Sequence, residues 1–571
     1  MAKNTKLELT WIGKEKRPRL EPRVLIEDPS KSYHAAVRRG PNDIFDNLLI
    51  HGDNLLALKA LEQEYVGKVK CIYIDPPFNT GNAFENYDDG LEHSIWLSLM
   101  RERLELLKGL LHPTGTIYVH IDNNEQAYLK VVMDEIFHRD NFVQMISVKR
   151  ASPAGFKVVN PGPLTVTDYI LLYAKDKNRM VYHPQRIPVE YDENYDLLIS
   201  NPKDRPEDWT FTKLVDVLYK QYGFNSWRDA KSAWGENWSL IRSNFLGGLA
   251  LKYADSVVSV RDPHKPTESL KQKLAESKKN QGKVVVFERE NNSPLYLLNG
   301  GCLSFYKNKL RVIDGKNVPT ELLTDFWADI NFAGIAKEGG VQFKNSKKPE
   351  MLVSRVFEMG SNPGDLVLDS FLGSGTTAAV AHKMGRRWIG IELGDHCYTH
   401  CLPRLKGVVD GTDQTGVSKS VDWQGGGGFR FYELAPTLIK EDAFGQKIIN
   451  PQYDPEKLTE AVCKLEGFTY APSETEYFIH GHSTERDFIY VTTNYLKAEH
   501  LRALSELVGD RRTLLICCKG FTTPGDLPNL TVKKIPKAVL DRCEYGHDDY
   551  SLNVKNLPMA EKEPEQGDLF E

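Results

Sequence analysis

Residues 365–392 contain the pattern that most restricts the fold of this chain. An apolar strand, Asp365 to Asp369, leads into the loop Ser370 to Gly375; a helix, Thr376 to Met384, and a second strand, Arg387 to Glu392, follow. A strand, a helix and a strand in this order form a βαβ unit, whose strands lie parallel in one sheet. The pattern therefore predicts an α/β fold with helices on both faces of the sheet.

The same alternation begins near Asn47 and extends the predicted sheet. The pattern predicts helices at 55–61, 96–111 and 131–137, and strands at 48–53, 71–74, 116–122, 142–148 and 169–173. Strands that alternate with helices favour a parallel, doubly wound sheet.

The alternation stops between about Asp176 and Gly334, so the α/β domain is predicted to be divided by an insertion. The predicted organisation is an N-terminal arm (1–45), a first α/β half (46–178), the insertion (179–334), a second α/β half (335–410), a glycine-rich linker (411–428) and a small C-terminal α/β domain (429–571).

The insertion is rich in aromatic and basic residues. Its tryptophans are Trp209, Trp227, Trp234, Trp238 and Trp327, and they are interleaved with lysine and arginine. This pattern fits a nucleic-acid surface, on which bases stack and phosphates pair with cations. It fits equally a small domain whose tryptophans form the core, and for any single tryptophan the core interpretation is favoured.

Composition restricts the class of protein. The chain of 571 residues is 41% hydrophobic, enough for several cores. It has no apolar run of membrane-spanning length, and Met1 to Lys6 lacks the apolar core of a signal peptide, so we expect a cytoplasmic protein without a membrane partner. The net charge of −5 excludes a uniformly basic nucleic-acid binder but not a local basic surface.

Eight cysteines are scattered along the chain, which suits a reducing compartment. Helical spacing would place Cys397 and Cys401 on one face. A zinc site usually has a second pair of ligands at a set spacing, and none is evident here. We therefore predict no metal site.

The stretch Cys71 to Gly81 is the first candidate site. It reads as a buried strand that ends at Asp75-Pro76-Pro77-Phe78, where neither proline donates a ladder hydrogen bond. The Asp75 carboxylate and the Pro76 carbonyl are acceptors, and Phe78 offers a flat face, so the turn suits a planar amine. An ordinary strand-ending turn is the alternative.

The loop of the βαβ unit is the second candidate site. Gly373 and Gly375 let the backbone approach a ligand at a helix N-terminus, and Glu392, at the end of the next strand, is placed to hold ribose hydroxyls. No Gly-Lys-Ser/Thr follows, so it is not a phosphate-binding Walker loop. A nicotinamide cofactor is an alternative, but the third glycine of that fingerprint is absent.

Together the two stretches resemble the amino-methyltransferases of DNA. Asp75 to Phe78 resembles motif IV, Asp369 to Thr377 motif I, Phe343 to Glu350 motif X and Gly52-Asp53 motif III. The resemblance implies a permuted, Rossmann-like sheet that binds S-adenosylmethionine, an inserted target-recognition domain, and the catalytic residues Asp75, Pro76, Pro77 and Phe78. It implies the cofactor-binding residues Asp53, Lys348, Asp369, Phe371, Gly373, Ser374, Gly375, Thr376, Thr377 and Glu392.

The order of the motifs, with motif IV before motif I, is similar to the β class. With Ile121 to Glu125 the chain looks most like the modification subunits of type III restriction-modification systems. This implies methylation of N6 of a flipped adenine in double-stranded DNA, a homodimer, and a separate helicase or nuclease subunit. Phe78 replaces the commoner tyrosine.

Other functions stay open. They are cytosine-N4 methylation, a subunit that chiefly recognises DNA for a nuclease, and methylation of RNA or protein. Methylation of cytosine at carbon 5 would need a cysteine nucleophile in a Pro-Cys pair, and the sequence contains no such pair.

Overall fold

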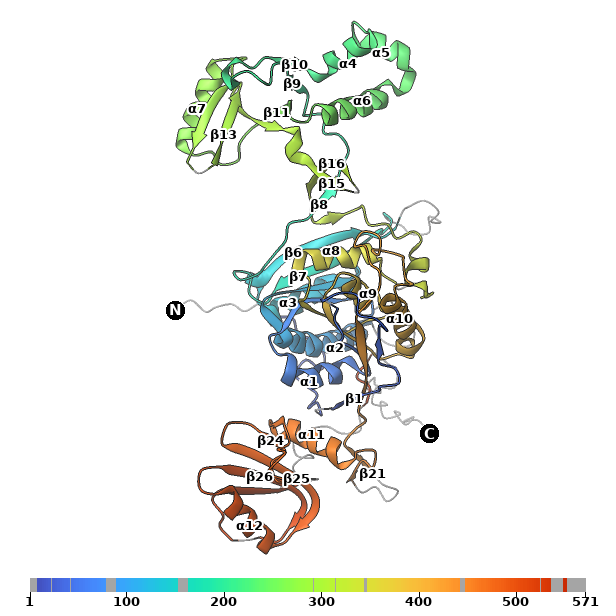
Figure 1. The fold of residues 1–571 in the computed structure, drawn as a ribbon, viewed down its shortest axis with the longest axis vertical. Coiled ribbons are helices and arrows are strands. Elements are labelled where there is room, and N and C mark those ends of the chain that lie inside the picture. Colours follow the sequence, from blue (N-terminus) through green and yellow to red (C-terminus); the bar gives the residue numbers. More distant parts are fainter. Residues whose placement is uncertain are drawn as a thin grey trace, which may run out of the picture. The chain divides into compact units, whose positions relative to one another are not determined.

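The computed structural model describes residues 8–21, 23–41, 43–78, 89–151, 163–290, 292–313, 315–343, 347–441, 447–523, 525–535 and 548–551. They form two compact units (Figure 1). The large unit combines Met1–His183 with Thr324–Glu571, and the inserted unit is Pro184–Leu323. The inserted unit lies within the interval 179–334 predicted for the insertion.

An 11-stranded sheet forms the core of the large unit. Its strands, in order across the sheet, are β1 (Leu25–Glu27), β20 (Gly428–Leu434), β3 (Asn47–His51), β19 (Arg387–Glu392), β18 (Leu366–Asp369), β4 (Val69–Ile74), β5 (Leu111–Ile121), β7 (Thr167–Ala174), β6 (Phe142–Lys149) and β17 (Phe326–Trp327), with β2 (Tyr33–His34) paired to β20. Both strands of the βαβ unit, β18 and β19, therefore lie between β3 and β4.

The sheet is mixed, which corrects the expectation of a parallel one. Strands β20, β3, β19, β18, β4 and β5 are parallel to their neighbours in that series. Strand β7 is antiparallel to both β5 and β6, and β1 and β2 are antiparallel to β20. The sequence pattern places β6 and β7 in succession with no predicted helix between them, and only a crossover connection joins parallel strands.

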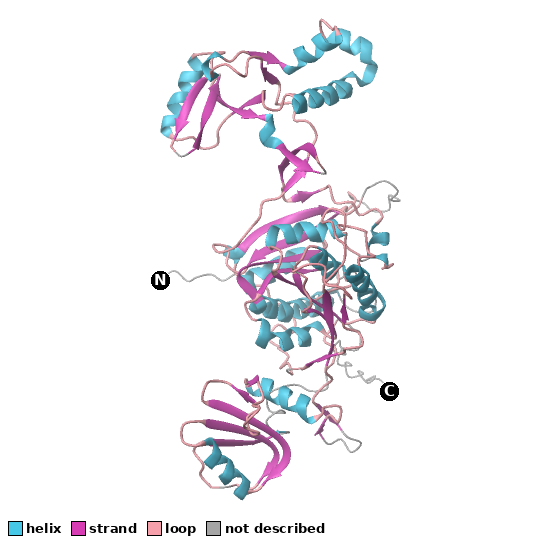
Figure 2. Cartoon of the chain, in the orientation of Figure 1, coloured by secondary structure: helices cyan, strands magenta, loops and turns pink. Residues whose placement is uncertain are grey.

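Helices cover both faces of this sheet (Figure 2). They are α1 (Asn54–Tyr65), α2 (Asp89–Leu110), α3 (Gln126–Phe137), α8 (Glu350–Gly360), α9 (Thr376–Lys383) and α10 (Leu402–Asp410). Successive strand residues point to opposite faces. Ile72 and Ile74 of β4 pack in one core cluster with α1, α2 and α3, whereas Cys71 lies against Gly360 of α8.

Residues 428–434 belong to the large sheet, whereas the sequence analysis assigned residues from 429 onward to the C-terminal domain. Strand β20 pairs in parallel with β3, and Phe429 and Phe431 are fully buried. The N-terminal segment predicted to be an arm supplies β1 and β2 beside β20. These pairings join segments distant in sequence, which local periodicity does not reveal.

Residues after β20 form a smaller sheet within the large unit. Its five strands are β23 (Thr469–Tyr470), β24 (Gly481–His482), β25 (Asp487–Leu496), β26 (Thr513–Phe521) and β27 (Leu530–Lys534). Helices α11 (Pro455–Glu466) and α12 (Ala498–Val508) and the hairpin of β21 (Ile439–Glu441) and β22 (Lys447–Ile449) accompany it. Strands β25 and β26 are parallel with α12 between them in sequence, an arrangement in keeping with the small α/β domain predicted for this part.

The described residues of the inserted unit form two antiparallel sheets and four α-helices. Its strands are β8 (Arg186–Pro188), β9 (Leu197–Ile199), β10 (Phe211–Lys213), β11 (Val257–Arg261), β12 (Val285–Arg289), β13 (Asn292–Leu298), β14 (Gly301–Phe305), β15 (Leu310–Ile313) and β16 (Lys316–Leu322). Its helices are α4 (Leu214–Tyr222), α5 (Trp227–Trp234), α6 (Trp238–Lys252) and α7 (Glu268–Lys279).

Some tryptophans fit the core interpretation, and one fits the interpretation as a nucleic-acid surface. Trp327 is fully buried in β17 of the large sheet, outside the inserted unit. Trp209 packs against Tyr296 and Phe305 beside a core cluster of the inserted unit. Trp227, at the start of α5, is 50% exposed.

No helix within the described ranges has both the length and the apolar character needed to cross a membrane.

Candidate active site

The Asp75 turn begins directly after β4, at the carboxyl end of a buried strand. Pro76 is buried, and Phe78 packs against the core cluster that includes β4 and α2. The indole nitrogen of Trp96, on α2, donates a hydrogen bond to the Pro77 carbonyl at 2.9 Å. This bond and the two prolines set the conformation of the turn. Asn79 to Gly81 lie outside the described residues.

A lysine lies against the Asp75 carboxylate. Nζ of Lys348 is 2.8 Å from Oδ2 of Asp75 and 4.8 Å from the centroid of the Phe78 ring. Oδ1 of Asp75 is buried and has no hydrogen-bond partner among the described residues. The sequence analysis assigned Lys348 to the cofactor, but its contacts here are with the predicted catalytic residues.

The glycine loop lies at the same edge of the sheet as this turn. Strand β18 pairs in parallel with β4, Val367 opposite Cys71 and Leu368 opposite Ile72, so the segments that follow both strands emerge side by side. In open α/β sheets this carboxyl edge is where ligands bind. The structure thus brings Asp75 and Asp369 together from distant parts of the chain.

Asp369 ends β18 and organises the loop. Its carboxylate accepts hydrogen bonds from the Phe371 backbone N–H at 2.9 Å and from the Thr377 hydroxyl at 2.5 Å. Burial raises the pKa of Asp369 to about 7, and the nearby carboxylates of Asp75 and Glu392 add to this rise. The predicted residues Phe371 and Thr377 are therefore held by Asp369.

Glu392 ends β19 and fixes the glycines of the loop. Its two oxygens accept hydrogen bonds from the backbone N–H of Gly373 at 2.7 Å and of Gly394 at 2.9 Å. His396 lies 2.8 Å from the same carboxylate, which raises the pKa of that imidazole. The carboxylate therefore positions the loop as well as facing the edge where the resemblance places a ribose.

The loop geometry fits a ligand that approaches the backbone closely. Gly373 has φ +57°, and a side chain there would meet only the Phe371 carbonyl oxygen at 3.9 Å, so space is open above it. Gly375, with φ +79°, lies against Cys401, whose thiol donates to the Gly373 carbonyl at 3.1 Å. The buried Ser370 hydroxyl has no partner within the part of the chain that the structure describes. These features fit S-adenosylmethionine, the cofactor expected from the sequence.

Ser374 and Thr376 are held by a buried arginine. Their hydroxyl oxygens are 3.1 Å apart, and Arg404 of α10 donates to the Thr376 hydroxyl at 2.7 Å and to the Ser374 carbonyl at 3.3 Å. Arg404 in turn donates to Glu350 at 2.7 Å. The sequence gives Arg404 no motif, and Glu350, although it ends the stretch that resembles motif X, was assigned no role, because their contact joins residues far apart in sequence.

Asp53 lies at this edge of the sheet, but protein groups surround its carboxylate. Strand β3 pairs with β19, His51 opposite Glu392, which places Asp53 near the glycine loop. Its side chain caps α1 by accepting from the N–H of Leu55 at 2.9 Å and of Leu56 at 3.2 Å, and it accepts from the Tyr550 N–H at 2.9 Å. These bonds show that Asp53 has a structural role. Its role at the cofactor stays a prediction.

A buried polar chain that the sequence analysis missed lies beside Phe78. The Tyr73 hydroxyl is 2.9 Å from Nδ1 of His120, and Nε2 of His120 is 3.4 Å from the Asp168 carboxylate. The His120 ring centroid lies 6.2 Å from that of Phe78. Burial lowers the pKa of His120, and the cation of Lys348 lowers it further. Isolated residues in apolar strands gave no signal for this cluster.

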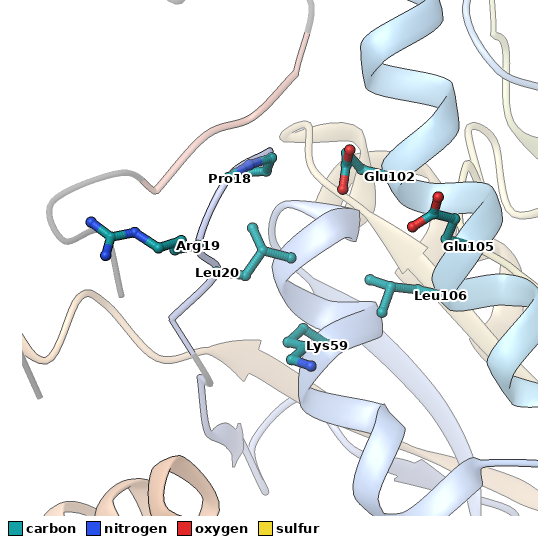
Figure 3. A pocket seen from close by; sticks show the side chains of 7 residues that line it. All are labelled: Pro18, Arg19, Leu20, Lys59, Glu102, Glu105 and Leu106. Carbon is teal, nitrogen blue, oxygen red and sulfur yellow. The ribbon is translucent and has the colours of Figure 1, made fainter. Parts of the chain in front are cut away.

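A separate hollow of about 270 Å³ lies between the N-terminal segment and helices α1 and α2 (Figure 3). It is lined by Pro18, Arg19, Leu20, Lys59, Glu102, Glu105 and Leu106. It contains no predicted site residue, so it is not the candidate active site.

Comparison with known proteins identifies a family. The sequence profile of the DNA methylase family, the N6 and N4 methyltransferases, matches residues 69–401. This interval includes the Asp75 turn, the inserted unit and the glycine loop.

Three relatives illustrate the similarity. The probable HindVI Mod subunit, of a type III restriction-modification enzyme of Haemophilus influenzae, is 37% identical over 421 residues, which cover 68% of this chain and 54% of the relative. The type II methyltransferase M.EcaI of Enterobacter cloacae is 28% identical over 61% of this chain and 67% of its own. The EcoP15I Mod subunit of Escherichia coli is 26% identical over 66% and 62%. The chain therefore spans about half the length of the first relative.

Proposed function

Because the chain belongs to the DNA methylase family of N6 and N4 methyltransferases, we propose that it is a site-specific DNA methyltransferase. It transfers a methyl group from S-adenosylmethionine to an exocyclic amine of a DNA base. One observation carries the proposal: the Asp75 turn and the glycine loop follow adjacent parallel strands, β4 and β18, at one edge of the sheet.

The Asp75 turn binds and orients the amine. The base is flipped out of the duplex, because its amine is not accessible to the enzyme inside the stack. Phe78 stacks on the ring, while the Asp75 carboxylate and the Pro76 carbonyl accept hydrogen bonds from the amine. These bonds favour a pyramidal nitrogen whose lone pair points at the methyl donor. Transfer then rests on positioning and electrostatics.

The glycine loop, with Glu392, holds the cofactor. When bound, S-adenosylmethionine supplies an electrophilic methyl group on its sulfonium. Gly373 and Gly375 let the backbone approach the ligand, and Asp369, Thr376 and Thr377 keep the loop in place. Strands β18 and β19 come after β4 in the sequence, yet they lie between β3 and β4 in the sheet, with β18 directly beside β4. This order supports the permuted arrangement of the β class.

The target that we propose is adenine N6. The Asp form of the motif in this permutation resembles adenine enzymes, whereas serine forms are commoner for cytosine N4. The physics of Asp75 serves either amine, so N4 of cytosine is the alternative that base identification decides.

Replacing Glu392 is expected to weaken cofactor binding. Glu392→Ala removes the acceptor for the N–H groups of Gly373 and Gly394, and two charge-assisted hydrogen bonds lost from a binding loop correspond to about a tenfold weaker affinity or more. Isothermal titration with S-adenosylmethionine measures it. Asp395→Ala, at an exposed neighbour, is the control. An unchanged affinity in Glu392→Ala would remove this residue from the cofactor site.

We propose that the inserted unit recognises the DNA sequence. Trp227, on α5, is half exposed. Its ring centroid lies 5.8 Å from that of Trp238, on α6. Arg228 lies over the Trp227 ring, and Arg242 lies over the Trp238 ring. Aromatic faces next to guanidinium groups suit contact with bases and phosphates.

Trp227→Ala is expected to weaken DNA binding. Loss of one base stacked on an aromatic side chain corresponds to roughly 1–3 kcal/mol, which is about a fivefold to hundredfold rise in Kd. Fluorescence anisotropy with a labelled duplex that contains the methylated sequence measures this Kd. Tyr477→Ala, at an exposed aromatic residue after α11, is the matched control. Equal affinities of both variants would contradict a DNA contact at Trp227.

The partner that we propose is a restriction subunit. The HindVI and EcoP15I relatives are Mod subunits of type III restriction-modification enzymes. The given sequence contains no Gly-x-x-x-x-Gly-Lys-Ser/Thr motif, and we propose that an ATP-driven helicase of that type is a separate subunit. A homodimer of the modification subunit is also proposed, from the resemblance.

The decisive experiment follows methyl transfer from radiolabelled S-adenosylmethionine to DNA, RNA and protein. We expect label in double-stranded DNA. Sequencing of methylated bases in DNA from cells that express the chain then gives the base and the recognition sequence. Label only in RNA or protein would contradict the proposal, and DNA binding without transfer would favour a recognition subunit.

A further inference from the structure

Lys348 occupies the position at which the proposed function places the target amine. Its ammonium is 2.8 Å from Oδ2 of Asp75 and 4.8 Å from the centroid of the Phe78 ring. The amine of a flipped base would need the same carboxylate, and its ring the same aromatic face. The lysine ammonium is a cationic N–H donor, and the base amine is a neutral one. The ammonium can therefore take the place of the amine at the same acceptor.

The surroundings of Lys348 allow its side chain to leave while its backbone stays. The preceding Lys347 is 4% exposed and donates to the carbonyls of Val341, at 2.9 Å, and Glu338. The following residues, Pro349 and Glu350, begin helix α8, and Glu350 is bound in a buried ionic cluster. The Lys348 side chain is 12% exposed, and among the described residues its ammonium pairs with one carboxylate oxygen and lies over one ring face.

The Asp75 carboxylate has further capacity to accept. Oδ1 is buried without a hydrogen-bond partner in the described ranges, while Oδ2 faces the lysine. A buried carboxylate oxygen without a donor is unfavourable, so a ligand that donates to Asp75 is expected to bind there. Exchange of the lysine for a base amine would keep Asp75 paired at each stage.

We propose that the Lys348 ammonium fills the amine site of the free enzyme, and that the incoming base displaces it. This inference rests on the proposed function. Lys348 is then a positioning residue: it keeps Asp75 oriented without substrate and sets a threshold that a base must overcome to enter. The sequence resemblance instead predicts that Lys348 binds the cofactor, so the two roles are separable.

The test uses the full chain and a duplex of the methylated sequence with 2-aminopurine at the target position, whose emission rises when the base leaves the stack. Lys348→Met removes the cation and keeps the length of the side chain. We expect half-maximal emission at about a three- to tenfold lower protein concentration than for the wild type, because the partly exposed ion pair and the cation–π contact of Lys348 no longer compete with the base. The affinity for S-adenosylmethionine should be unchanged. Lys348→Arg, which keeps a cation, should stay near the wild type.

Lys337→Met, at an exposed lysine before α8, is the matched control, and Lys348→Ala serves the same test if Lys348→Met does not fold. Base extrusion equal to the wild type would overturn the inference. A weaker affinity for S-adenosylmethionine in Lys348→Met would overturn it in favour of the cofactor role. If the wild type neither extrudes the base nor transfers a methyl group, the proposed function fails first.

Discussion

Asp75→Ala is expected to lower the rate of methyl transfer by about 10²- to 10³-fold while S-adenosylmethionine still binds. The variant removes the carboxylate that, in the proposed function, accepts the hydrogen bond of the target amine, and we expect the Pro76 carbonyl and Phe78 alone not to orient the nitrogen lone pair. Asp369, Glu392 and Arg404 hold the glycine loop, so we expect cofactor binding to be independent of Asp75. Single-turnover transfer of labelled methyl to DNA measures the rate, and titration calorimetry measures cofactor affinity.

Two further variants refine this test. Asp75→Asn keeps the shape and one acceptor but loses the charge, so its rate should fall between those of the wild type and Asp75→Ala. Asp140→Ala changes an exposed carboxylate and should leave the rate unchanged. Normal turnover by Asp75→Ala would refute the assignment of the Asp75 turn as the catalytic site.

Glu350→Gln is expected to destabilise the large unit by about 3–5 kcal/mol. Glu350 is fully buried and accepts from Lys383 at 3.0 and 3.1 Å, from Arg404 at 2.7 Å and from the Val417 N–H at 3.1 Å. Removal of its charge leaves two buried cations with less compensation, since among the described residues only Asp413, 2.8 Å from Lys383, remains as a carboxylate paired with either. A buried charge without its partner is among the most destabilising changes in a core.

Urea unfolding followed by tryptophan fluorescence measures this loss. The exposed pair of Lys273 and Glu276, with side chains 44% and 47% exposed, gives a matched control, because Glu276→Gln should change stability by less than about 0.5 kcal/mol. Arg404 also holds Ser374 and Thr376, so Glu350→Gln should weaken cofactor binding as well. An unfolding midpoint equal to that of the wild type would show that the cluster does not stabilise the unit.

Local sequence signals predicted the two candidate sites as strand-end turns. Proline after an apolar run marked the end of β4 at Ile74, and glycines after Asp369 marked the segment between β18 and α9. These residues restrict the backbone of their own neighbourhood, so the signal needs no tertiary contact.

Other features had no local signal. Nothing local in the sequence separates β20 from the strands of the C-terminal part, and its pairing with β3, β1 and β2 assigns it to the large sheet. Trp227 and Trp209 look alike in sequence, but one is half exposed and the other packs on Tyr296.

The sequence by itself determined which residues we propose for the chemistry: a carboxylate, two prolines and an aromatic ring in one turn, and a glycine loop followed by an acid in another. Only the tertiary structure decided that β4 and β18 are neighbours, that Lys348 meets Asp75, and that Glu350, Lys383 and Arg404 share one buried cluster. The physical reason is the separation along the chain over which each interaction acts. Backbone preferences act over a few residues, whereas ion pairs and strand pairing join segments that meet only once the chain has folded.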